Sequence, residues 1–254
     1  MKIVLITGCS SGFGLETARY FLERDWSVIA TMRAPRTDVL PATGRLRVLP
    51  LDVTDPVSIH GLVDAAGPID ALVNNAGIGW LNALEGTPME IARDLFETNT
   101  IGTMAMTQAF LPQFRERGQG VVVNVTSSVT LAPLPLLSVY TASKAAVNAF
   151  TESLVLELRP FNIRAHLVLP GRAPDTRFSQ SAQGRIAANG GFPEAYAGVV
   201  QGVFAGWAEL SPADVTQPRD VAEAVWRAVT DPSAPLHIPA GVDALALATA
   251  KAAA

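Results

Sequence analysis

Apolar residues recur along the chain in short runs of strand length, separated by stretches with helical spacing. The runs are Lys2–Ile6, Ser27–Thr31, Leu46–Leu51, Ala71–Val73, Val121–Val125, Ala165–Leu169 and Leu236–Ile238. Continuous β-branched and leucine runs are typical of strands that are buried on both faces of a parallel sheet. Alternation of such strands with helices predicts repeated βαβ units and right-handed crossovers. The pattern predicts a doubly wound α/β fold, with about seven parallel strands and helices on both faces.

A glycine-rich segment follows the first apolar run directly. Residues Thr7–Gly14 have the sequence TGCSSGFG, and a helical pattern begins after them. A strand, a glycine-rich turn and a helix in this order place a pyrophosphate at the helix N-terminus. Gly8 would permit the tight turn, Gly12 the close approach of the backbone to a ligand, and Gly14 the packing of helix on strand. The spacing is G-x-x-x-G-x-G rather than G-x-G-x-x-G, and it is the strand, turn and helix context that favours a dinucleotide site over a plain turn.

Tyr140 and Lys144 form the second candidate site. They are four residues apart, so on a helix they lie on one face, one turn apart. A phenol ordinarily has a pKa near about 10. A nearby ammonium and a position in the first helical turn both lower that pKa, which would suit a general acid or base. Ser127 follows the strand-like run Val121–Val125 and could meet the phenol. The alternative is a surface tyrosine and lysine on an ordinary helix.

Several motifs occur together and in order. They are TGCSSGFG at Thr7–Gly14, NNAG at Asn74–Gly77, Asn99, Ser127, YTASK at Tyr140–Lys144, and Pro170-Gly171. On these residues the chain resembles the short-chain dehydrogenase/reductase family, in its single-domain branch, over nearly its whole length. The residues within these motifs are similar to those of 17β-hydroxysteroid and retinol dehydrogenases, and equally to those of many bacterial oxidoreductases of unknown substrate. The resemblance implies a Rossmann-type fold and one NAD(P)-binding domain over residues 1–254.

The same resemblance implies a mechanism of hydride transfer between a nicotinamide and a carbonyl carbon. Ser127 would hydrogen-bond the substrate oxygen, and Tyr140 would give or take its proton. Lys144 would lower the Tyr140 pKa and hold the nicotinamide ribose. Asn99 would bend its helix and use its main chain to hold a water that hydrogen-bonds the lysine. Asn and Gly are poor residues for a helix interior, which indicates a local reason for their presence. The alternative to this role for Asn99 is a plain irregularity of the helix.

The end of the second predicted strand indicates which nicotinamide cofactor is used. A carboxylate there would accept the ribose 2′-hydroxyl of NAD, whereas a cation would pair with the 2′-phosphate of NADP. Met32 occupies the carboxylate position, Arg33 follows it, and Arg36 is a second candidate cation. The resemblance therefore implies NADP(H) rather than NAD(H). Ser11 stands where NADP-dependent relatives often carry a basic residue, and Arg33 as a solvated loop residue is the alternative.

Further cofactor contacts are carried over from the family, position by position. They are Gly8, Ser10, Ser11, Gly12, Phe13, Gly14, Arg33, Asp52, Val53, Asn75, Ala76, Gly77, Tyr140, Lys144, Pro170, Gly171 and Thr176. Two have open alternatives. Asp52 could instead cap the helix that begins near Pro56. The turn after Gly171, which includes Asp175, is one residue longer than usual, so the contact of Thr176 is in doubt.

The substrate side is apolar. Residues 129–139 are nearly free of charge, and Pro133 and Pro135 deny them regular structure. Residues 172–212 are expected to be the least regular part and to form a lid over the cofactor. This segment carries Phe178, Phe192, Tyr196, Phe204 and Trp207. A variable insertion whose aromatic residues join the core is the alternative. The implied substrate is a small apolar ketone, aldehyde or alcohol.

Composition narrows the remaining classes of function. The net charge of −4 argues against a nucleic-acid partner. No uninterrupted apolar run reaches transmembrane length, so no membrane partner is expected. The first strand begins by residue 3 and leaves no room for a signal peptide, and the single Cys9 fits a reducing compartment. A cytoplasmic enzyme is therefore expected.

Other expectations concern metals, assembly and competing activities. His60, His166 and His237 are isolated in the sequence, so no metal site is predicted. The resemblance implies a homodimer or homotetramer through long helices near residues 88–117 and 140–158. A non-catalytic NADP(H)-sensing regulator on the same fold is the main alternative function. A sugar-nucleotide epimerase is disfavoured, because those relatives carry an added substrate domain.

Overall fold

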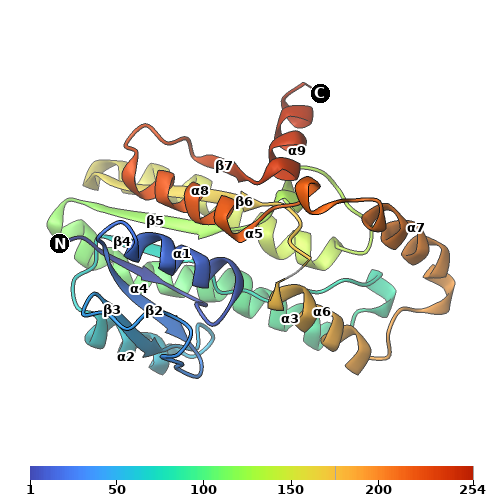
Figure 1. Ribbon diagram of the computed structural model, residues 1–254, viewed down its shortest axis with the longest axis horizontal. Helices are drawn as coiled ribbons and strands as arrows, with labels where there is room; N and C mark the ends of the chain where they lie inside the picture. Colours follow the sequence, from blue (N-terminus) through green and yellow to red (C-terminus); the bar gives the residue numbers. More distant parts are fainter. Residues whose placement is uncertain (175, 254) are drawn as a thin grey trace.

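A parallel sheet of seven strands lies at the centre of the molecule, with helices on both of its faces (Figure 1). The computed structural model describes residues 1–174 and 176–253. In chain order the strands are β1 Ile3–Ile6, β2 Ser27–Met32, β3 Leu46–Pro50, β4 Ala71–Asn74, β5 Gly120–Val125, β6 Ile163–Pro170 and β7 His237–Ala240. Every neighbouring pair is parallel. The predicted doubly wound, Rossmann-type α/β fold is confirmed.

The order of the strands across the sheet is β3-β2-β1-β4-β5-β6-β7. The chain therefore moves outward from β1 to β3 and then returns to place β4 on the other side of β1. In open parallel sheets, ligands bind at the carboxyl edge where the strand order reverses in this way. The glycine-rich segment follows β1 at that edge, so the topology puts it at the expected binding position.

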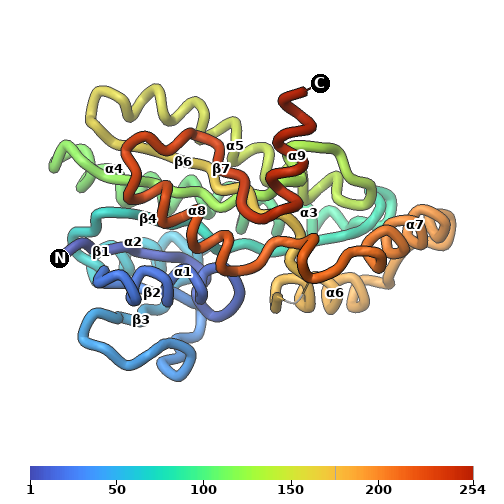
Figure 2. Tube along the Cα trace, turned by 45° about the horizontal axis from the view of Figure 1, so that its top comes forward, coloured from blue at the N-terminus to red at the C-terminus, as the bar shows by residue number. Residues whose placement is uncertain are grey.

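Helices cover the two faces in separate groups. Their bounds are α1 Gly12–Leu22, α2 Pro56–Ala66, α3 Met89–Phe96, α4 Gly102–Arg117, α5 Ser138–Leu158, α6 Arg177–Ala188, α7 Ala197–Ala208, α8 Pro218–Thr230 and α9 Val242–Ala252. Helices α1 and α8 share one hydrophobic cluster with the sheet, and α2, α4 and α5 share another. Figure 2 shows these two layers on either side of the strands.

The central strands show why their sequences read as continuous apolar runs. Val4 and Ile6 of β1 pack with α1 and α8, whereas Leu5 packs with the helices of the opposite face. Successive side chains of a strand point to opposite faces, so a strand covered on both sides must be apolar at every position. All three side chains are fully buried.

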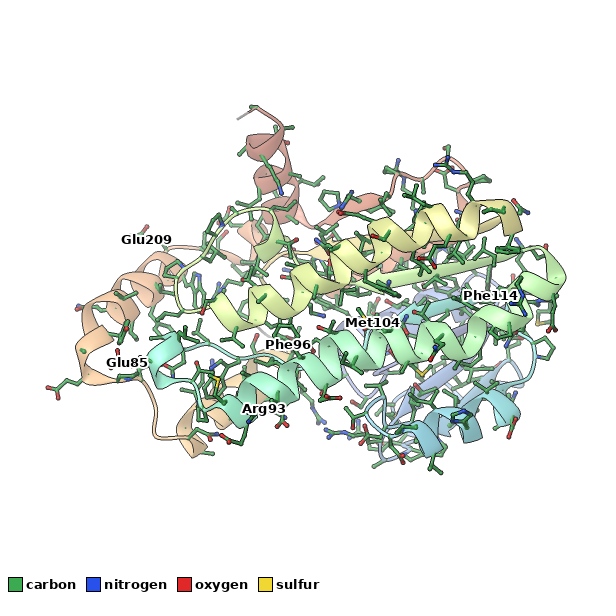
Figure 3. All side chains as sticks on the ribbon, turned by 180° about the vertical axis from the view of Figure 1, so that it is seen from behind. Glu85, Arg93, Phe96, Met104, Phe114 and Glu209 are labelled. Atoms are coloured by element: carbon green, nitrogen blue, oxygen red, sulfur yellow. The ribbon has the colours of Figure 1, made fainter. Side chains whose placement is uncertain are left out.

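Helices α3 and α4 continue one another in a single helical rod that lies beside α5 (Figure 3). A π-helical turn, Glu97–Ile101, joins them and contains Asn99. The irregularity that the sequence predicts around Asn99 is therefore confirmed. The rod also carries exposed apolar side chains, including Phe96 and Ile101, and Leu156 is exposed on α5.

The segment 172–212 is more regular than the sequence predicts. It contains α6 and α7, and Figure 1 shows them extending beyond the end of the sheet. The expectation that this is the least regular part is wrong, because its glycines are compatible with helix. Within α7, a Cβ built on Gly198, Gly202 or Gly206 would have no neighbour within 4 Å. Glycine in a helix costs only about 1 kcal/mol relative to alanine.

The alanine-rich C-terminal segment is helical and partly packed. It forms α9 after β7, and Ala244 in its first turn is fully buried. Among the described residues, none of the helices combines the length and apolar character needed to cross a lipid bilayer.

Candidate active site

Ser127 and Tyr140 meet at the carboxyl edge of the sheet. Ser127 follows β5, and its Oγ accepts a hydrogen bond from the backbone N–H of Val129 at 3.3 Å. The Ser127 side chain is close enough to the Tyr140 hydroxyl to lower the tyrosine pKa by hydrogen bonding. Tyr140 lies in the first turn of α5. Both side chains are buried, so the sequence prediction that they come together is matched by the geometry.

Lys144 lies one helical turn after Tyr140 and points toward the same edge. Its Nζ donates to the carbonyl oxygen of Val125, at the end of β5, over 3.1 Å. A Cβ built on Gly77 would lie 3.4 Å from this Nζ. The glycine of the NNAG motif therefore leaves the space into which the ammonium projects.

The ionisation of the pair differs from the sequence prediction. Burial raises the pKa of Tyr140 to about 12, and the hydrogen bond to Ser127 opposes that shift only in part. Burial lowers the pKa of Lys144 to about 8. The expectation of a depressed tyrosine pKa is wrong for this structure, because removal of the phenolate from water outweighs the favourable contacts. The sequence shows the neighbours of Tyr140 but not its desolvation.

Asn99 joins the two sides of the site through its amide group. Its Oδ1 accepts from Ile78 N at 2.8 Å, and its Nδ2 donates to Ile78 O at 3.0 Å. The same Nδ2 donates to Ser143 Oγ at 3.1 Å. Ser143 Oγ in turn lies 2.7 Å from the carbonyl oxygen of Tyr140. The π-helical turn thus presents Asn99 so that it fixes the loop after β4 against α5.

The glycine-rich segment has the conformation that its glycines predict. Gly8 and Gly12 have φ of 76° and 58°, values that favour glycine. A Cβ on Gly8 would lie 2.9 Å from Ala76 Cα, and one on Gly14 would overlap the carbonyl oxygen of Gly8. The turn and the close helix packing therefore both require glycine.

A cavity of about 250 Å³ opens at the N-terminus of α1. Its lining is Ser11, Gly12, Leu15, Glu16, Arg19, Thr176, Arg177 and Pro218. Peptide N–H groups and the helix dipole at such a position favour an anion. Arg177 adds positive charge to the wall, whereas Arg19 lies 3.8 Å from the carboxylate of Glu16. This arrangement fits the pyrophosphate of a dinucleotide, and Arg177 is a lining residue that the sequence motifs do not identify.

The NNAG segment buttresses the glycine turn from β4. Asn75 Nδ2 donates to Thr7 O at 2.8 Å and to Gly8 O at 3.2 Å. The backbone N–H groups of Asn75 and Ala76 both donate to Thr7 Oγ1 at 2.9 Å. The side chain and the backbone N–H of Asn75 thus both hold the glycine loop in shape.

Arg33 and Asp52 lie near one another at the ends of β2 and β3. The pKa of Asp52 is lowered, first by hydrogen bonds from Thr54 and also by the charge of Arg33. Asp52 does not cap α2, because Asp55 makes the capping bond to Val57 N at 2.9 Å. That alternative for Asp52 is wrong. Val53 follows Asp52 and packs against Gly102, where a Cβ would lie 2.9 Å from Val53 Cγ2.

Arg36 reaches the glycine segment from the second strand's end. Its Nη2 donates to the carbonyl oxygen of Ser10 at 3.3 Å, and its Nε is buried without a hydrogen-bond partner. A basic side chain therefore approaches the loop from outside, although Ser11 occupies the loop position at which the family often places one. Phe13 packs against the α1 and α8 cluster, so its side chain is directed into the core.

Thr176 lies beside the glycine loop despite the longer turn. A Cβ on Gly12 would lie 3.8 Å from Thr176 Cβ. Thr176 Oγ1 donates to Ala173 O at 2.9 Å, so the hydroxyl is engaged in the turn itself. Asp175, the extra residue in this turn, lies outside the described residues. Pro170 ends β6, and the register Val125↔Val168 brings it level with Ser127.

Aromatic and aliphatic side chains close the substrate side. The Phe178 ring lies 6.0 Å from the Tyr140 ring, centroid to centroid. Tyr140 also belongs to a hydrophobic cluster against which Phe192, Tyr196 and Trp207 pack. These aromatics therefore pack with one another and with the cluster that contains Tyr140. Trp80 is buried, and its Nε1 donates to Thr87 Oγ1 at 2.9 Å.

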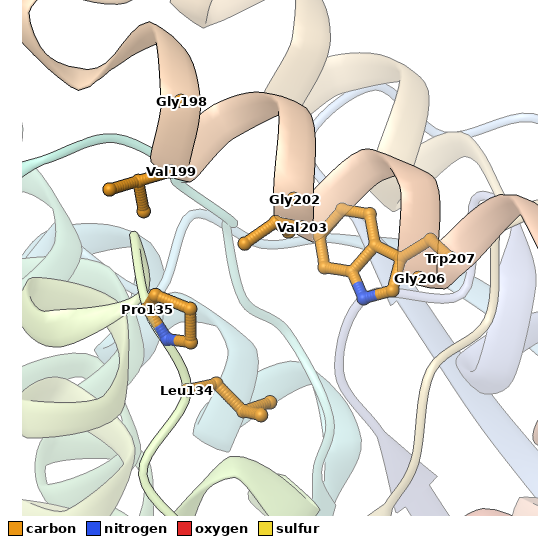
Figure 4. A pocket seen from close by; sticks show the side chains of 8 residues that line it. All are labelled: Leu134, Pro135, Gly198, Val199, Gly202, Val203, Gly206 and Trp207. Atoms are coloured by element: carbon orange, nitrogen blue, oxygen red, sulfur yellow. The ribbon is translucent and has the colours of Figure 1, made fainter.

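Figure 4 shows a second cavity between α7 and the loop that precedes α5. It has a volume of about 400 Å³ and is lined by Leu134, Pro135, Gly198, Val199, Gly202, Val203, Gly206 and Trp207. The three glycines present no side chain to it. The walls carry no charged residue, so the cavity suits an apolar group.

Other candidates from the sequence have structural explanations. Cys9 is fully buried, and burial raises the pKa of its thiol to about 12, so it fills space in the loop. His237 Nε2 lies 2.9 Å from Glu152 Oε1, and His166 Nδ1 lies 2.9 Å from Pro235 O. Within the described part of the chain, no group of three or more His, Cys, Asp or Glu side chains could hold a metal ion.

Comparison with known proteins gives a consistent result. Residues 2–185 match the sequence profile of the family described as short chain dehydrogenase. An uncharacterized oxidoreductase of Bacillus subtilis is 41% identical over 191 residues, which are 71% of this chain and 68% of the relative. The 3-ketodihydrosphingosine reductase of Bacteroides thetaiotaomicron is 38% identical over 174 residues, 67% of this chain and 63% of the relative. Human 17-beta-hydroxysteroid dehydrogenase type 1 is 37% identical over 180 residues, 65% of this chain and 55% of the relative. The matched part of the chain thus spans between about half and two thirds of these curated relatives.

Solved structures agree over the whole chain. A short-chain dehydrogenase from Streptomyces avermitilis superposes with a TM-score of 0.82 at 32% identity, and the match covers 100% of this chain and 94% of that one. A short chain dehydrogenase from Burkholderia cenocepacia in complex with NADP has a TM-score of 0.78 at 27% identity, with coverage of 100% and 95%. The resemblance that the sequence motifs carry is therefore confirmed.

Proposed function

The chain belongs to the short-chain dehydrogenase/reductase family, and on that premise we propose that it interconverts an apolar ketone or aldehyde and the corresponding alcohol with NADP(H). The observation that carries the proposal is the placement of Ser127 beside the Tyr140 hydroxyl, whose pKa it lowers, with Lys144 one turn further on the same helix. These three side chains converge at the carboxyl edge of β5, on the side of the sheet where the glycine loop also lies.

The residues around the glycine loop fit a nicotinamide dinucleotide. The N-terminus of α1, with Gly12 and the cavity beside it, would hold the pyrophosphate. The backbone of Asn75, Ala76 and Gly77 would line the ribose, and Lys144 would bond the ribose nearer the nicotinamide. The bound nicotinamide supplies or accepts the hydride.

Proton transfer is the task of the chain's own side chains. Ser127 donates its free hydroxyl proton toward the substrate oxygen and stabilises the negative charge that develops there. Tyr140 delivers a proton to that oxygen during reduction and removes it during oxidation. A pKa near 12 keeps the phenol protonated at neutral pH, so it has a proton to give to the substrate oxygen. The main chain of Asn99 would hold a water that hydrogen-bonds Lys144, and this water would replenish the proton that Tyr140 gives up.

The choice of NADP(H) over NAD(H) rests on two arginines. Arg33 follows β2 directly after Met32, which occupies the position where a carboxylate would select NAD. Arg36 contacts the Ser10 carbonyl, so a second cation lies against the glycine loop. The NADP complex of the Burkholderia relative supports the same preference.

An apolar substrate is supported by the cavity beside α7. The hydrophobic cluster that contains Tyr140 extends to Val203 and Trp207, which also line that cavity. A carbonyl held at Ser127 and Tyr140 could therefore extend an apolar tail toward α7. The names of the sphingoid-base and steroid relatives are in keeping with a lipid-like substrate. In this proposal residues 172–212 act as a lid on a single domain that spans residues 1–254.

Assembly and location complete the proposal. Exposed apolar side chains on the α3–α4 rod and on α5, among them Phe96, Ile101 and Leu156, would be covered in a homodimer or homotetramer. We place the protein in the cytoplasm, where its single buried Cys9 would stay reduced.

The experiment is a screen of NADPH and NADH oxidation with ketones and aldehydes whose apolar tails increase in length. Turnover with NADPH that improves with tail length is the expected result. Tight NADPH binding without turnover of any carbonyl would instead favour a non-catalytic NADP(H) sensor. Absence of binding to either nucleotide would overturn the proposal entirely.

A further inference from the structure

The turn that follows β6 is held by two side chains from distant parts of the chain. Arg172 N donates to Asp243 Oδ2 at 2.6 Å, and Gly171 N donates to Thr216 Oγ1 at 2.9 Å. Thr216 Oγ1 lies 2.6 Å from Asp243 Oδ1, so the two side chains are also bonded to each other. Thr216 N donates to Arg172 O at 2.9 Å. The peptide N–H groups of Gly171 and Arg172 are thus both hydrogen-bonded to these two side chains.

Asp243 sits directly against Gly171. A Cβ built on Gly171 would overlap the carboxylate, so the glycine leaves the space that the carboxylate fills. A Cβ built on Gly241 would likewise overlap Thr216 Oγ1. Two glycines, one after β6 and one after β7, therefore make room for one small polar cluster. Because β6 and β7 pair with Pro170 opposite Ala240, the cluster is locked to the sheet edge.

A carboxylate is well suited to this position. Asp243 lies in the first turn of α9, where the helix dipole stabilises negative charge. An ionised carboxylate accepts stronger and shorter hydrogen bonds than an amide does. Asparagine could still accept one bond, but it would present an NH₂ group to a second donor. The acid is therefore favoured over an amide of the same size, since the Thr216 hydroxyl, which also lies 2.9 Å from Ala240 O, would have to reorient to accept from the amide.

Arg172 connects this cluster to the lid. Its guanidinium lies 4.8 Å from the centroid of the Trp207 ring on α7. Its backbone is bonded at both the N–H and the C=O, as described above. Asp243 of the C-terminal helix α9 thereby fixes the orientation of the turn on one side. On the other side, the Arg172 side chain contacts the lid helix α7.

We propose that Asp243, together with Thr216, is a positioning residue for the nicotinamide end of the cofactor. This inference rests on the proposed function and on the expectation from the family resemblance that Pro170 and Gly171 contact the cofactor, a contact that we assign to its nicotinamide end. By holding that turn, Asp243 sets the position of the nicotinamide relative to Tyr140. The C-terminal helix α9 is then part of the cofactor site, although it carries no dinucleotide-binding motif.

The test compares two ligands that differ only in the nicotinamide. Dissociation constants are measured for NADPH and for the same nucleotide lacking nicotinamide, 2′-phospho-ADP-ribose, with the full-length protein. Asp243→Asn should weaken NADPH binding by at least about tenfold and leave 2′-phospho-ADP-ribose within about twofold. Thr216→Val should act in the same direction and provides a second variant if Asp243→Asn folds poorly. The turnover number should fall with Asp243→Asn, since a misplaced nicotinamide reacts slowly.

Asp220→Asn is the matched control. Asp220 also lies in a first helical turn, that of α8, and accepts from its own Gln217 N at 2.8 Å. It should change the affinity of neither ligand. Equal weakening of both ligands by Asp243→Asn and Thr216→Val, or no weakening of either, would overturn the inference. If the wild-type protein binds neither nucleotide, the proposed function fails first, and this outcome is recognisable before any variant is examined.

Discussion

The side chain of Ser127 lies close enough to the hydroxyl of Tyr140 to lower the tyrosine pKa, although thirteen residues of sequence separate the two. Ser127 follows a strand and Tyr140 opens a helix, so the contact depends on the return of the intervening loop to the sheet edge. The serine oxygen accepts from Val129 N, so its hydroxyl keeps its own proton to donate to the phenol oxygen. The same proton can be redirected to a substrate oxygen placed between them.

Ser127→Ala should slow turnover without loss of cofactor binding. Removal of one hydrogen-bond donor to developing negative charge typically costs about 10²–10³-fold in turnover number. Steady-state NADPH oxidation and NADPH affinity are the measurements. Ser128→Ala is the control, since Ser128 is a buried neighbour in the same short turn. Wild-type turnover in the Ser127 variant would remove this residue from the mechanism.

Arg33→Asp should shift the preference from NADPH toward NADH. The substitution removes the cation that would pair with the 2′-phosphate and supplies a carboxylate that can accept from the ribose hydroxyl. The ratio of kcat/KM for the two nucleotides is the measured quantity. Arg45→Ala should leave the ratio unchanged, because Arg45 precedes β3 at the opposite edge of the sheet. An unaltered ratio in the Arg33 variant would contradict the assignment.

The buried Lys144 should make stability depend on pH. Its pKa of about 8 in the folded protein is below the unfolded value of 10.5, so the unfolded state binds more protons between these values. The Lys144 contribution to the free energy of unfolding therefore rises from about pH 8 to pH 10.5. The shift corresponds to on the order of 3 kcal/mol.

Lys144→Met isolates this effect from other groups that titrate in the same range. The difference in unfolding free energy between wild type and variant, from urea denaturation, should move in favour of the wild type as the pH rises. Lys251→Met alters an exposed lysine on α9 and should give a curve parallel to that of the wild type. Parallel curves for Lys144→Met as well would show that the lysine is not desolvated.

Gly202→Leu should block long substrates without harming the fold. A Cβ at Gly202 meets nothing within 4 Å, and the residue lines the cavity beside α7. The leucine would fill part of the cavity, so the apolar tail of a long substrate would lose its contacts there. We expect kcat/KM to fall by at least about tenfold for long-chain carbonyls and to stay unchanged for short-chain carbonyls. Gly184→Leu on α6 is the matched control, since its Cβ is also unobstructed and it does not line this cavity. An equal effect on short and long substrates would argue against a tail in the cavity.

The strands and the glycine loop could be predicted because their signals are local. Each buried strand is a continuous apolar run, and the φ values of Gly8 and Gly12 follow from residue type. The irregular turn at Asn99 was equally visible, since Asn and Gly disfavour a regular helix interior. These features depend on neighbours in sequence, and the structure agrees with them.

Other features depend on packing between distant segments and could not be predicted. The glycines of α7 suggest a loop in sequence, yet they lie on a helix face with open space beside it. The raised pKa of Tyr140 arises from burial by several elements at once. The contact of Asp243 with the turn after β6 requires the pairing of β6 with β7, for which no local pattern exists.

The most direct measurement is the single-turnover oxidation of NADPH by Tyr140→Phe, alongside the wild type and Tyr20→Phe, with the best carbonyl substrate from the screen. Phenylalanine keeps the ring and its packing but removes the proton that the proposal assigns to the substrate oxygen. The account predicts NADPH affinity close to wild type, a rate lower by about 10²–10⁴-fold for Tyr140→Phe, and no change for Tyr20→Phe. A Tyr140→Phe rate within a few-fold of wild type would contradict it.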